Sequence, residues 1–261
     1  MKEVCCQFGP HAQLAGILSE PAVSTRRTSV VLVSAGVTPK FGPFRLYAEL
    51  ARCLAGEGFR TLRFDLGGIG DSGQAYAGYP LEQRTELEIG AALDHLSQSF
   101  ELDGVILLGL CSGAEDSFRY AEQDRRVTRV VMIDPFAYRT SGFAWRHWRY
   151  RARQRLLRAV GLYQPLCREA GKSLVNYAYM APSESGRILR TLLKRKVRLH
   201  FVYTGGMSRH FNHRGQLQAM FRGVDFDGLI QLDHLPHLDH TQAFATDRRI
   251  LIDRIAARLV E

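Results

Sequence analysis

The feature that most constrains the fold of this chain is the pentapeptide Gly-Leu-Cys-Ser-Gly at residues 109–113. It follows the apolar run 105–108 and precedes residues 112–122, whose pattern predicts a helix. Glycines on both sides of a nucleophilic side chain suit a turn that leaves no room for a Cβ. Such a turn holds its central residue in a strained backbone and exposes the side chain above the sheet. The pentapeptide therefore predicts a strand–turn–helix unit that presents Cys111.

Strand and helix patterns alternate along most of the chain. Strand patterns, several of them continuous apolar runs typical of strands buried on both faces, occupy 29–34, 61–66, 105–110, 127–134, 197–203 and 229–232. Helical patterns occupy 43–55, 81–96, 112–122 and 241–260. This alternation predicts an α/β fold with a mostly parallel central sheet and helices on both faces. Ligands of such sheets bind at the carboxyl ends of the strands.

Residues 136–196 interrupt the alternation, because they show helical stretches such as 145–160 and no strand pattern. We therefore predict a core formed by residues 1–135 and 197–261, with residues 136–196 as a basic helical cap. Between Phe136 and Val197 eleven Arg and three Lys face two Glu, a net charge of +12 in a chain whose total is +9. The rest of the chain is consequently mildly acidic, and the basic segment needs an explanation of its own.

The chain resembles the α/β-hydrolase superfamily over nearly its full length. The resemblance rests on four segments in the expected order, at residues 34–37 (SAGV), 63–72 (RFDLGGIGDS), 109–113 (GLCSG) and 238–241 (LDHT). With GP-x-R-x-Y at 42–47, the chain is also similar to bacterial hydrolases associated with exosortase and exopolysaccharide gene clusters. The resemblance implies an α/β-hydrolase fold with a lid inserted after the strand that follows the 109–113 turn.

The resemblance also implies that Cys111 is the nucleophile and that a histidine shortly before the last helix is the general base. His240 has 21 residues after it and fits that position. A free thiol has a pKa of about 8.5, so a neighbouring histidine and the N-terminus of the following helix would both favour the thiolate. Ser112 is a rival nucleophile, but Leu110 does not fit the small residue that this role would require.

Backbone N–H groups are expected to hold the oxyanion of the reaction. The N–H of Ser112, next to the nucleophile, is one candidate donor. The other lies in the loop after the first central strand, at Gly36 or Val37. Other members of the superfamily often have His-Gly in this loop, whereas this chain has SAGV at 34–37.

The acid of a catalytic triad is the least determined member. The usual position, after the strand that ends at Tyr203, reads Thr-Gly-Gly-Met-Ser and contains no carboxylate. Asp134, which follows the preceding strand, is one candidate; Asp225 or Asp227 is another; a Cys–His pair without an acid is the third. His234 and His237 compete with His240, and their cluster with Asp233 and Asp239 raises the alternative of a metal site. We expect no metal and no cofactor.

The basic segment has three interpretations, which centre on Trp145, Arg146, Trp148 and Arg149. Its helix can be a solvated face, can bind an anionic substrate or an acidic acyl carrier protein, or can lie on an anionic membrane surface. No motif supports binding to nucleic acid. The small-molecule acyl substrate and its carrier are therefore the expected partners.

Cysteine usage and hydropathy bear on the compartment. The five cysteines, Cys5, Cys6, Cys53, Cys111 and Cys167, show no CxxC spacing and are expected to be reduced thiols. No apolar run reaches the ~18 residues of a membrane span, and residues 1–13 lack the apolar core of a signal peptide. We expect a cytoplasmic protein.

Together these features predict a thioesterase-like hydrolase that acts through an S-acyl intermediate on Cys111. Because that intermediate is itself a thioester, exchange with a thioester substrate costs little free energy, whereas formation from an oxygen ester is less favourable. Two alternatives remain open. One is an acyltransferase that passes the acyl group to an amine or alcohol, and the other is a non-catalytic binding protein on a hydrolase scaffold.

Overall fold

A central sheet organises the computed structural model, which describes residues 1–23, 26–161 and 180–261. Its strands are β1 (Lys2–Phe8), β2 (Leu14–Glu20), β3 (Thr28–Val33), β4 (Arg60–Phe64), β5 (Gly104–Leu110), β6 (Val127–Ile133), β7 (Arg198–Thr204) and β8 (Ile230–Leu235). The described helices are α1 (Leu46–Gly56), α2 (Leu81–Ser99), α3 (Ser112–Ala121), α4 (Phe143–Ala159), α5 (Pro182–Lys194), α6 (Gln216–Met220) and α7 (Ala245–Val260). Strand order in the sheet is β1-β2-β4-β3-β5-β6-β7-β8.

The sheet is mostly parallel, as the alternation of strands and helices predicts. Pairing is parallel from β4 through β3, β5, β6 and β7 to β8, whereas β1 pairs with β2, and β2 with β4, in antiparallel fashion. The carboxyl ends of β3, β5, β6, β7 and β8 therefore lie along one edge of the sheet. Gly36, Cys111, Asp134 and His240 each follow one of these ends.

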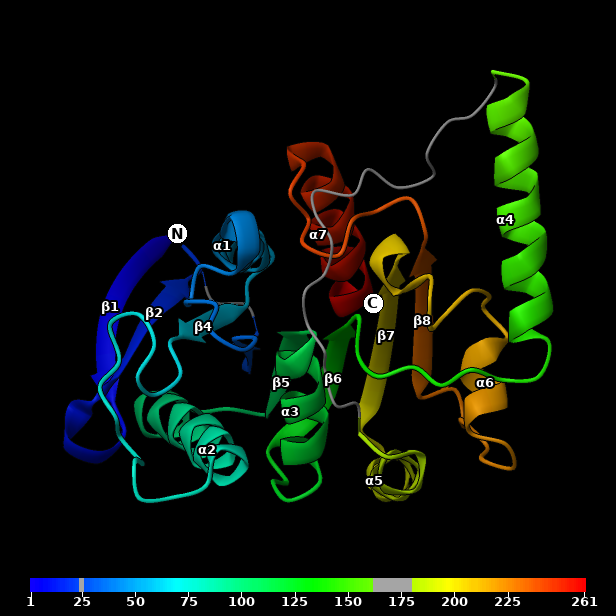
Figure 1. Ribbon diagram of the computed structural model, residues 1–261. Helices are drawn as coiled ribbons and strands as arrows, with labels where there is room; N and C mark the ends of the chain where they lie inside the picture. The colour runs from blue at the N-terminus through cyan, green and yellow to red at the C-terminus, as the bar shows by residue number, and fades with distance from the viewer. Residues whose placement is uncertain (24–25, 162–179) are drawn as a thin grey trace.

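Helices cover both faces of the sheet (Figure 1). In β3, Val31 and Val33 pack in the core that α2, α3 and α5 cover, and Val30 and Leu32 pack in the core beneath α1 and α7. This alternation explains why β3 reads as a continuous apolar run, because a strand buried on both faces needs apolar side chains at every position.

The N-terminal antiparallel pair β1–β2 extends the sheet beyond the expected strands. β1 is an edge strand whose residues are mostly exposed or half-buried, among them Cys5, so it lacks the apolar run that marks the central strands. The helix expected over 43–55 begins only at Leu46, because Phe44 and Arg45 have φ values of 46° and 69°. The helix expected over 241–260 begins at Ala245, after a loop that contains His240.

The described residues of the segment 136–196 form two helices in different settings. α4 stands at one side of the molecule, and only Phe143 among its residues is buried. α5 buries Ile188, Leu189 and Leu192 in the core on the α3 side of the sheet. Residues 162–179, which include Cys167 of the expected reduced thiols, lie outside the described part of the chain.

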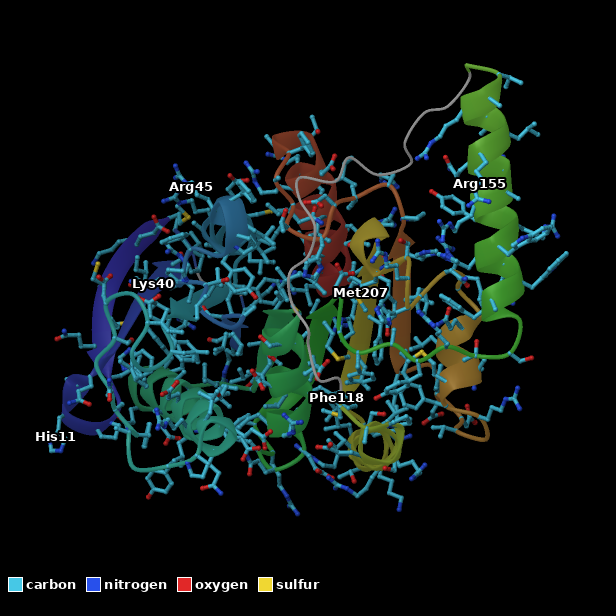
Figure 2. All side chains as sticks on the ribbon, in the orientation of Figure 1. His11, Lys40, Arg45, Phe118, Arg155 and Met207 are labelled. Atoms are coloured by element: carbon cyan, nitrogen blue, oxygen red, sulfur yellow. The ribbon has the colours of Figure 1, made fainter. Side chains whose placement is uncertain are left out.

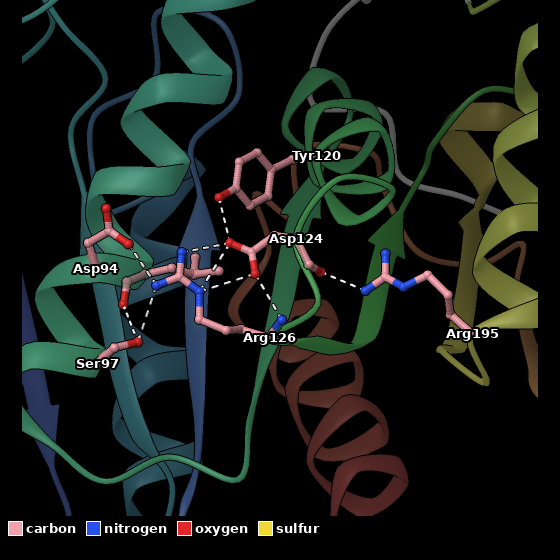
Figure 3. A network of polar contacts seen from close by, with 7 residues as sticks. Asp94, Ser97, Tyr120, Asp124, Arg126 and Arg195 are labelled. Atoms are coloured by element: carbon pink, nitrogen blue, oxygen red, sulfur yellow. Dashed lines mark hydrogen bonds and ion pairs between the residues drawn. The ribbon is translucent and has the colours of Figure 1, made fainter.

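Hydrogen bonds fix the end of α5 to the rest of the core (Figure 3). The Arg195 guanidinium donates to the Asp124 carbonyl oxygen at 2.6 Å and to the Ala121 carbonyl oxygen at 2.5 Å. The Asp124 carboxylate in turn accepts hydrogen bonds from Tyr120 and Arg126. α5 is thereby anchored to the turn between α3 and β6, as a helix of the core would be.

Within the described residues, no helix is both long enough and apolar enough to cross a lipid bilayer.

Candidate active site

Cys111 lies at a strained turn between β5 and α3. Its backbone has φ 55° and ψ −120°, a conformation that costs energy for a residue with a side chain. A Cβ on Gly109 would lie 2.1 Å from the Gly113 carbonyl oxygen, and one on Gly113 would lie 2.4 Å from the Val33 carbonyl oxygen. Neither flanking position can therefore hold a larger residue, which is the steric reason for the pentapeptide.

Ser112 occupies a different environment from its neighbour. It is the first residue of α3, it is buried, and its hydroxyl oxygen accepts a 2.9 Å hydrogen bond from the Gly36 N–H. As the first residue of the helix it has a backbone N–H without an intrahelical acceptor. The loop after β3 and the turn after β5 thus meet at Ser112, whereas the strained position belongs to Cys111.

The structure brings His240 and Asp134 together with Cys111. The His240 Nδ1 donates to Asp134 Oδ2 over 2.7 Å, and the Cys111 side chain is the second group that raises the pKa of this imidazole. Asp134 follows β6 and its side chain is fully buried, whereas the His240 side chain is 21% exposed. Gly206 lies against this histidine, since a Cβ there would be 2.3 Å from the His240 Cβ.

Asp134 is held by the residue that ends the next strand. The Thr204 N–H donates to Asp134 Oδ1 and the Thr204 hydroxyl to Asp134 Oδ2, both at 2.6 Å. The backbone of Asp134 itself is in the left-handed region, at φ 50°. In other members of the family a catalytic carboxylate usually follows the strand that corresponds to β7, but this chain has Thr204 there. Thr204 supplies two hydrogen-bond donors to Asp134, which follows the neighbouring strand β6. The sequence alone did not indicate a role for Thr204, because the catalytic residue expected after Tyr203 is a carboxylate.

The electrostatics of the site favour a protonated His240. Burial by itself lowers the pKa of the imidazole, but the hydrogen bonds and negative charges of Asp134 and Cys111 outweigh burial and raise the pKa to about 10. The imidazolium is therefore the stable form at neutral pH. A histidine in the same site as a cysteine is the arrangement that nucleophilic catalysis by cysteine requires.

The alternative carboxylates do not reach the histidine. Asp227 forms an ion pair with Lys196, and the Asp225 carboxylate accepts a 3.0 Å hydrogen bond from the Asp227 N–H. Both residues are exposed in the loop that enters β8, at the opposite end of that strand from His240. Neither Asp225 nor Asp227 is therefore the carboxylate that contacts His240.

The competing histidines also have other surroundings. His234 packs edge-on against Phe211, with ring centroids 5.3 Å apart, and burial together with Arg214 lowers its pKa. His237 is exposed. Among the described residues, no group of three His, Cys, Asp or Glu side chains is arranged to hold a metal ion.

The two remaining oxyanion candidates differ in their placement. The Gly36 N–H points at Ser112 and is engaged by its hydroxyl. Val37 is 87% exposed, so it lies at the rim of the loop. The geometry places Gly36, and not Val37, against the turn that contains Cys111.

Helix α4 borders a cavity of about 1270 Å³ beside these residues. We call it the arginine cavity, because it is lined by Arg139, Arg146, Arg151, Arg155, Arg158 and Arg209. Arg146 and Trp148 of the four expected binding residues line it, whereas Trp145 and Arg149 do not; Trp145 stacks on Trp148 with centroids 5.0 Å apart. Cys111 and His240 are not among its lining residues, but Thr204 is.

A comparison with family models agrees with the fold described above. A family model described as the alpha/beta hydrolase fold matches residues 31–174, more than half of the chain. The chain belongs to the alpha/beta hydrolase fold family. The α/β-hydrolase fold implied by the four sequence segments is thereby confirmed.

Solved structures of alpha/beta hydrolases superpose on nearly the whole chain. An esterase from Pyrococcus furiosus gives a TM-score of 0.63 at 14% identity, covering 99% of this chain and 90% of that chain. A Xanthomonas campestris serine hydrolase without a lid gives 0.60 at 12%, covering 99% and 95%. An alpha/beta serine hydrolase homologue from Coxiella burnetii gives 0.58 at 16%, covering 99% and 97%. No curated protein matches the chain.

Two of these neighbours are described as serine hydrolases. In this chain the residue at the strained turn is Cys111, and the serine beside it is turned into the protein. At identities of 12–16% the likeness to these structures concerns the fold. The chemistry has to be argued from the residues of this chain.

Proposed function

We propose that this protein hydrolyses acyl thioesters through an S-acyl intermediate on Cys111. The observation that carries the proposal is the hydrogen bond between His240 and the buried Asp134 carboxylate, in the same site as Cys111 at the strained turn. A buried carboxylate that orients a histidine, which in turn contacts a nucleophile, is the arrangement used in acyl transfer.

In the acylation step the Cys111 thiolate attacks the carbonyl carbon of the thioester. A new C–S bond forms, and the carbonyl oxygen becomes an oxyanion that the Ser112 backbone N–H stabilises. As the oxyanion collapses, the C–S bond of the substrate breaks. The leaving thiolate takes the proton of the His240 imidazolium and departs as a thiol, leaving neutral His240 and S-acyl Cys111.

Hydrolysis of the intermediate restores the starting state. Neutral His240 accepts a proton from water while the water oxygen attacks the acyl carbon. Collapse of the second oxyanion breaks the bond to Cys111 and releases the carboxylic acid. His240 is again an imidazolium and Cys111 again a thiolate, so protons and electron pairs balance over the cycle.

The choice of thioesters follows from the nucleophile. Because S-acyl Cys111 is a thioester, acylation by a thioester exchanges one C–S bond for another at little cost in free energy. Acylation by an oxygen ester would have to make the less stable bond from the more stable one. The non-catalytic alternative depended on a missing acid, and the contact between Asp134 and His240 removes that ground.

The test compares rates on matched substrates. Wild type is expected to turn over an acyl thioester faster than the oxygen ester with the same acyl group, and Cys111→Ala should lose at least about 10³-fold in kcat. Cys5→Ala, which removes an exposed thiol elsewhere, is the control and should retain full activity. Faster turnover of oxygen esters, or an unaffected Cys111→Ala variant, would overturn the proposal. Release of an ester or amide when alcohols or amines are added would point to acyl transfer instead.

A further inference from the structure

The arginines that line the arginine cavity have no role in the reaction proposed at Cys111. The cavity lies between α4 and the loops that follow β6, β7 and β8, on the side of the molecule where α4 stands (Figure 1). Thr204 and Gly205 form part of its lining, and Thr204 hydrogen-bonds Asp134. The cavity therefore borders the catalytic residues through a single side chain.

Positive charge dominates the wall of the cavity. Its six lining arginines are accompanied by no Asp or Glu side chain among the described lining residues. Two of the arginines are oriented by neutral oxygens: Arg139 Nε donates to the Arg209 carbonyl at 3.3 Å, and Arg146 Nε to Asn212 Oδ1 at 3.2 Å. Guanidinium groups thus line a concave space whose described lining residues include no carboxylate, which suits a ligand with several negative charges.

Aromatic rings stand among the arginines of the cavity. Phe143, Trp148 and Phe211 line it; Trp148 is 59% exposed, and the Arg139 guanidinium lies 5.3 Å from the centre of the Phe143 ring. Guanidinium groups bind phosphate oxygens in pairs, and planar guanidinium and indole groups stack on heteroaromatic rings. The combination fits a ligand that has both phosphates and a base.

We propose that the arginine cavity binds the nucleoside-phosphate end of an acyl thioester whose carrier is a nucleotide, as in coenzyme A. The inference rests on the proposed function, since it assigns the carrier of that same substrate. A volume of about 1270 Å³ exceeds the roughly 300–1000 Å³ typical of sites for small ligands, and so has room for a nucleotide with a connecting arm. The flexible arm then carries the thioester past Thr204 to Cys111.

A small anionic ligand is favoured over a membrane surface by the direction of the charge. Arg151 and Arg155 line the concave wall, whereas Arg149 and Arg153 of the same helix do not, although all four side chains are exposed. Figure 2 marks Arg155 on α4. The two pairs of arginines permit a matched comparison, because either double substitution removes the same charge from the same helix.

The experiment measures binding of adenosine 3′,5′-bisphosphate, a carrier fragment without a thioester, to the full chain by calorimetry. Wild type should bind it, Arg151→Gln/Arg155→Gln should bind at least tenfold more weakly, and Arg149→Gln/Arg153→Gln should stay within about twofold of wild type. The cavity variant should also raise KM for acyl-coenzyme A by a similar factor without changing kcat. KM for the short N-acetylcysteamine thioester should be the same in all three proteins.

The outcomes separate this inference from the proposed function. Absence of bisphosphate binding in wild type, or equal weakening by the two double variants, would overturn the carrier assignment even if thioesters are hydrolysed. Co-sedimentation of wild type with phosphatidylserine vesicles, lost in Arg149→Gln/Arg153→Gln, together with no bisphosphate binding, would assign α4 to membranes and overturn it as well. Bisphosphate binding by Cys111→Ala would support the cavity independently of catalysis.

Discussion

At the scale of single residues, the proposed chemistry depends on three side chains from three loops. Cys111 is half-buried at a strained turn, and Asp134 is buried and accepts hydrogen bonds from Thr204 and His240. The carboxylate has no solvent contact, so its hydrogen-bond donors determine where it points. The site therefore depends on Thr204 as well as on the three reacting groups.

Removal of the Thr204 hydroxyl tests that dependence. Thr204→Val keeps the shape and the backbone N–H but removes one donor to Asp134. Loss of a hydrogen bond to a charged group costs about 1.5 kcal/mol, which corresponds to roughly a tenfold lower kcat with little change in KM. Steady-state kinetics checks this, with Thr204→Ser as the variant expected to behave like wild type. Equal kcat in Thr204→Val and wild type would show that the hydroxyl is not needed.

The charge state of His240 depends on Asp134. In wild type the imidazole is expected to titrate near pH 10, because Asp134 and Cys111 stabilise the imidazolium against burial. Asp134→Asn removes the negative charge that stabilises the imidazolium, whereas burial still favours the neutral imidazole. The pKa of His240 should therefore fall well below its wild-type value. Titration of the imidazole followed by NMR measures both values, and an unchanged pKa in the variant would refute the assignment.

At the scale of single elements, the sequence identified the central strands and the helices next to them from their apolar patterns. It did not identify β1, because an edge strand with exposed residues lacks such a pattern. It also did not identify α5, although Ile188, Leu189, Leu192 and Leu193 lie on one helical face within the basic segment. The high positive charge of residues 136–196 favoured an exposed cap, although α5 packs in the core.

A core substitution in α5 measures its contribution. Leu192 is fully buried, and Leu192→Ala should lower the free energy of unfolding by about 2–5 kcal/mol through lost burial and a cavity. Urea denaturation measures the change, and Lys194→Ala on the exposed side should have little effect. If the two variants were equally stable, α5 would be a removable part of the cap and not a core helix.

Helix α3 contains a buried carboxylate with a predictable effect on stability. Burial raises the pKa of Glu115 to about 7, although the hydrogen bond from the Met180 N–H by itself lowers this pKa. The folded chain thus holds this proton between about pH 4.5 and 7, where the unfolded chain has released it. Stability associated with Glu115 is fully present below pH 4.5 and is lost as the pH rises through 7.

Glu115→Gln removes this dependence. Relative to the variant, wild type should lose about 3 kcal/mol of stability as the pH rises from 4.5 to 7. Chemical denaturation of both proteins at several pH values in this range gives the difference. A difference that stays constant, or that moves in favour of wild type as the pH rises, would contradict the burial argument.

At the scale of the whole molecule, the parallel sheet brings distant segments to one edge. Gly36, Cys111, Asp134 and His240 follow β3, β5, β6 and β8, and the order of these strands in the sheet makes their loops neighbours. The sequence could place each residue at the end of a strand. It could not choose among three acids, because that choice depends on which loop faces His240 in space. Likewise, only the arrangement of α4 shows which arginines line a cavity.

The most direct test of the central claim is the mass of the protein during turnover. Wild type mixed with an acyl thioester and quenched in acid should gain the mass of one acyl group, and peptide mapping should place it on Cys111. Cys111→Ala should show no adduct, whereas Ser112→Ala should still be acylated, since the Ser112 hydroxyl is engaged by Gly36. An adduct that maps to Ser112, or one that persists in Cys111→Ala, would contradict the account.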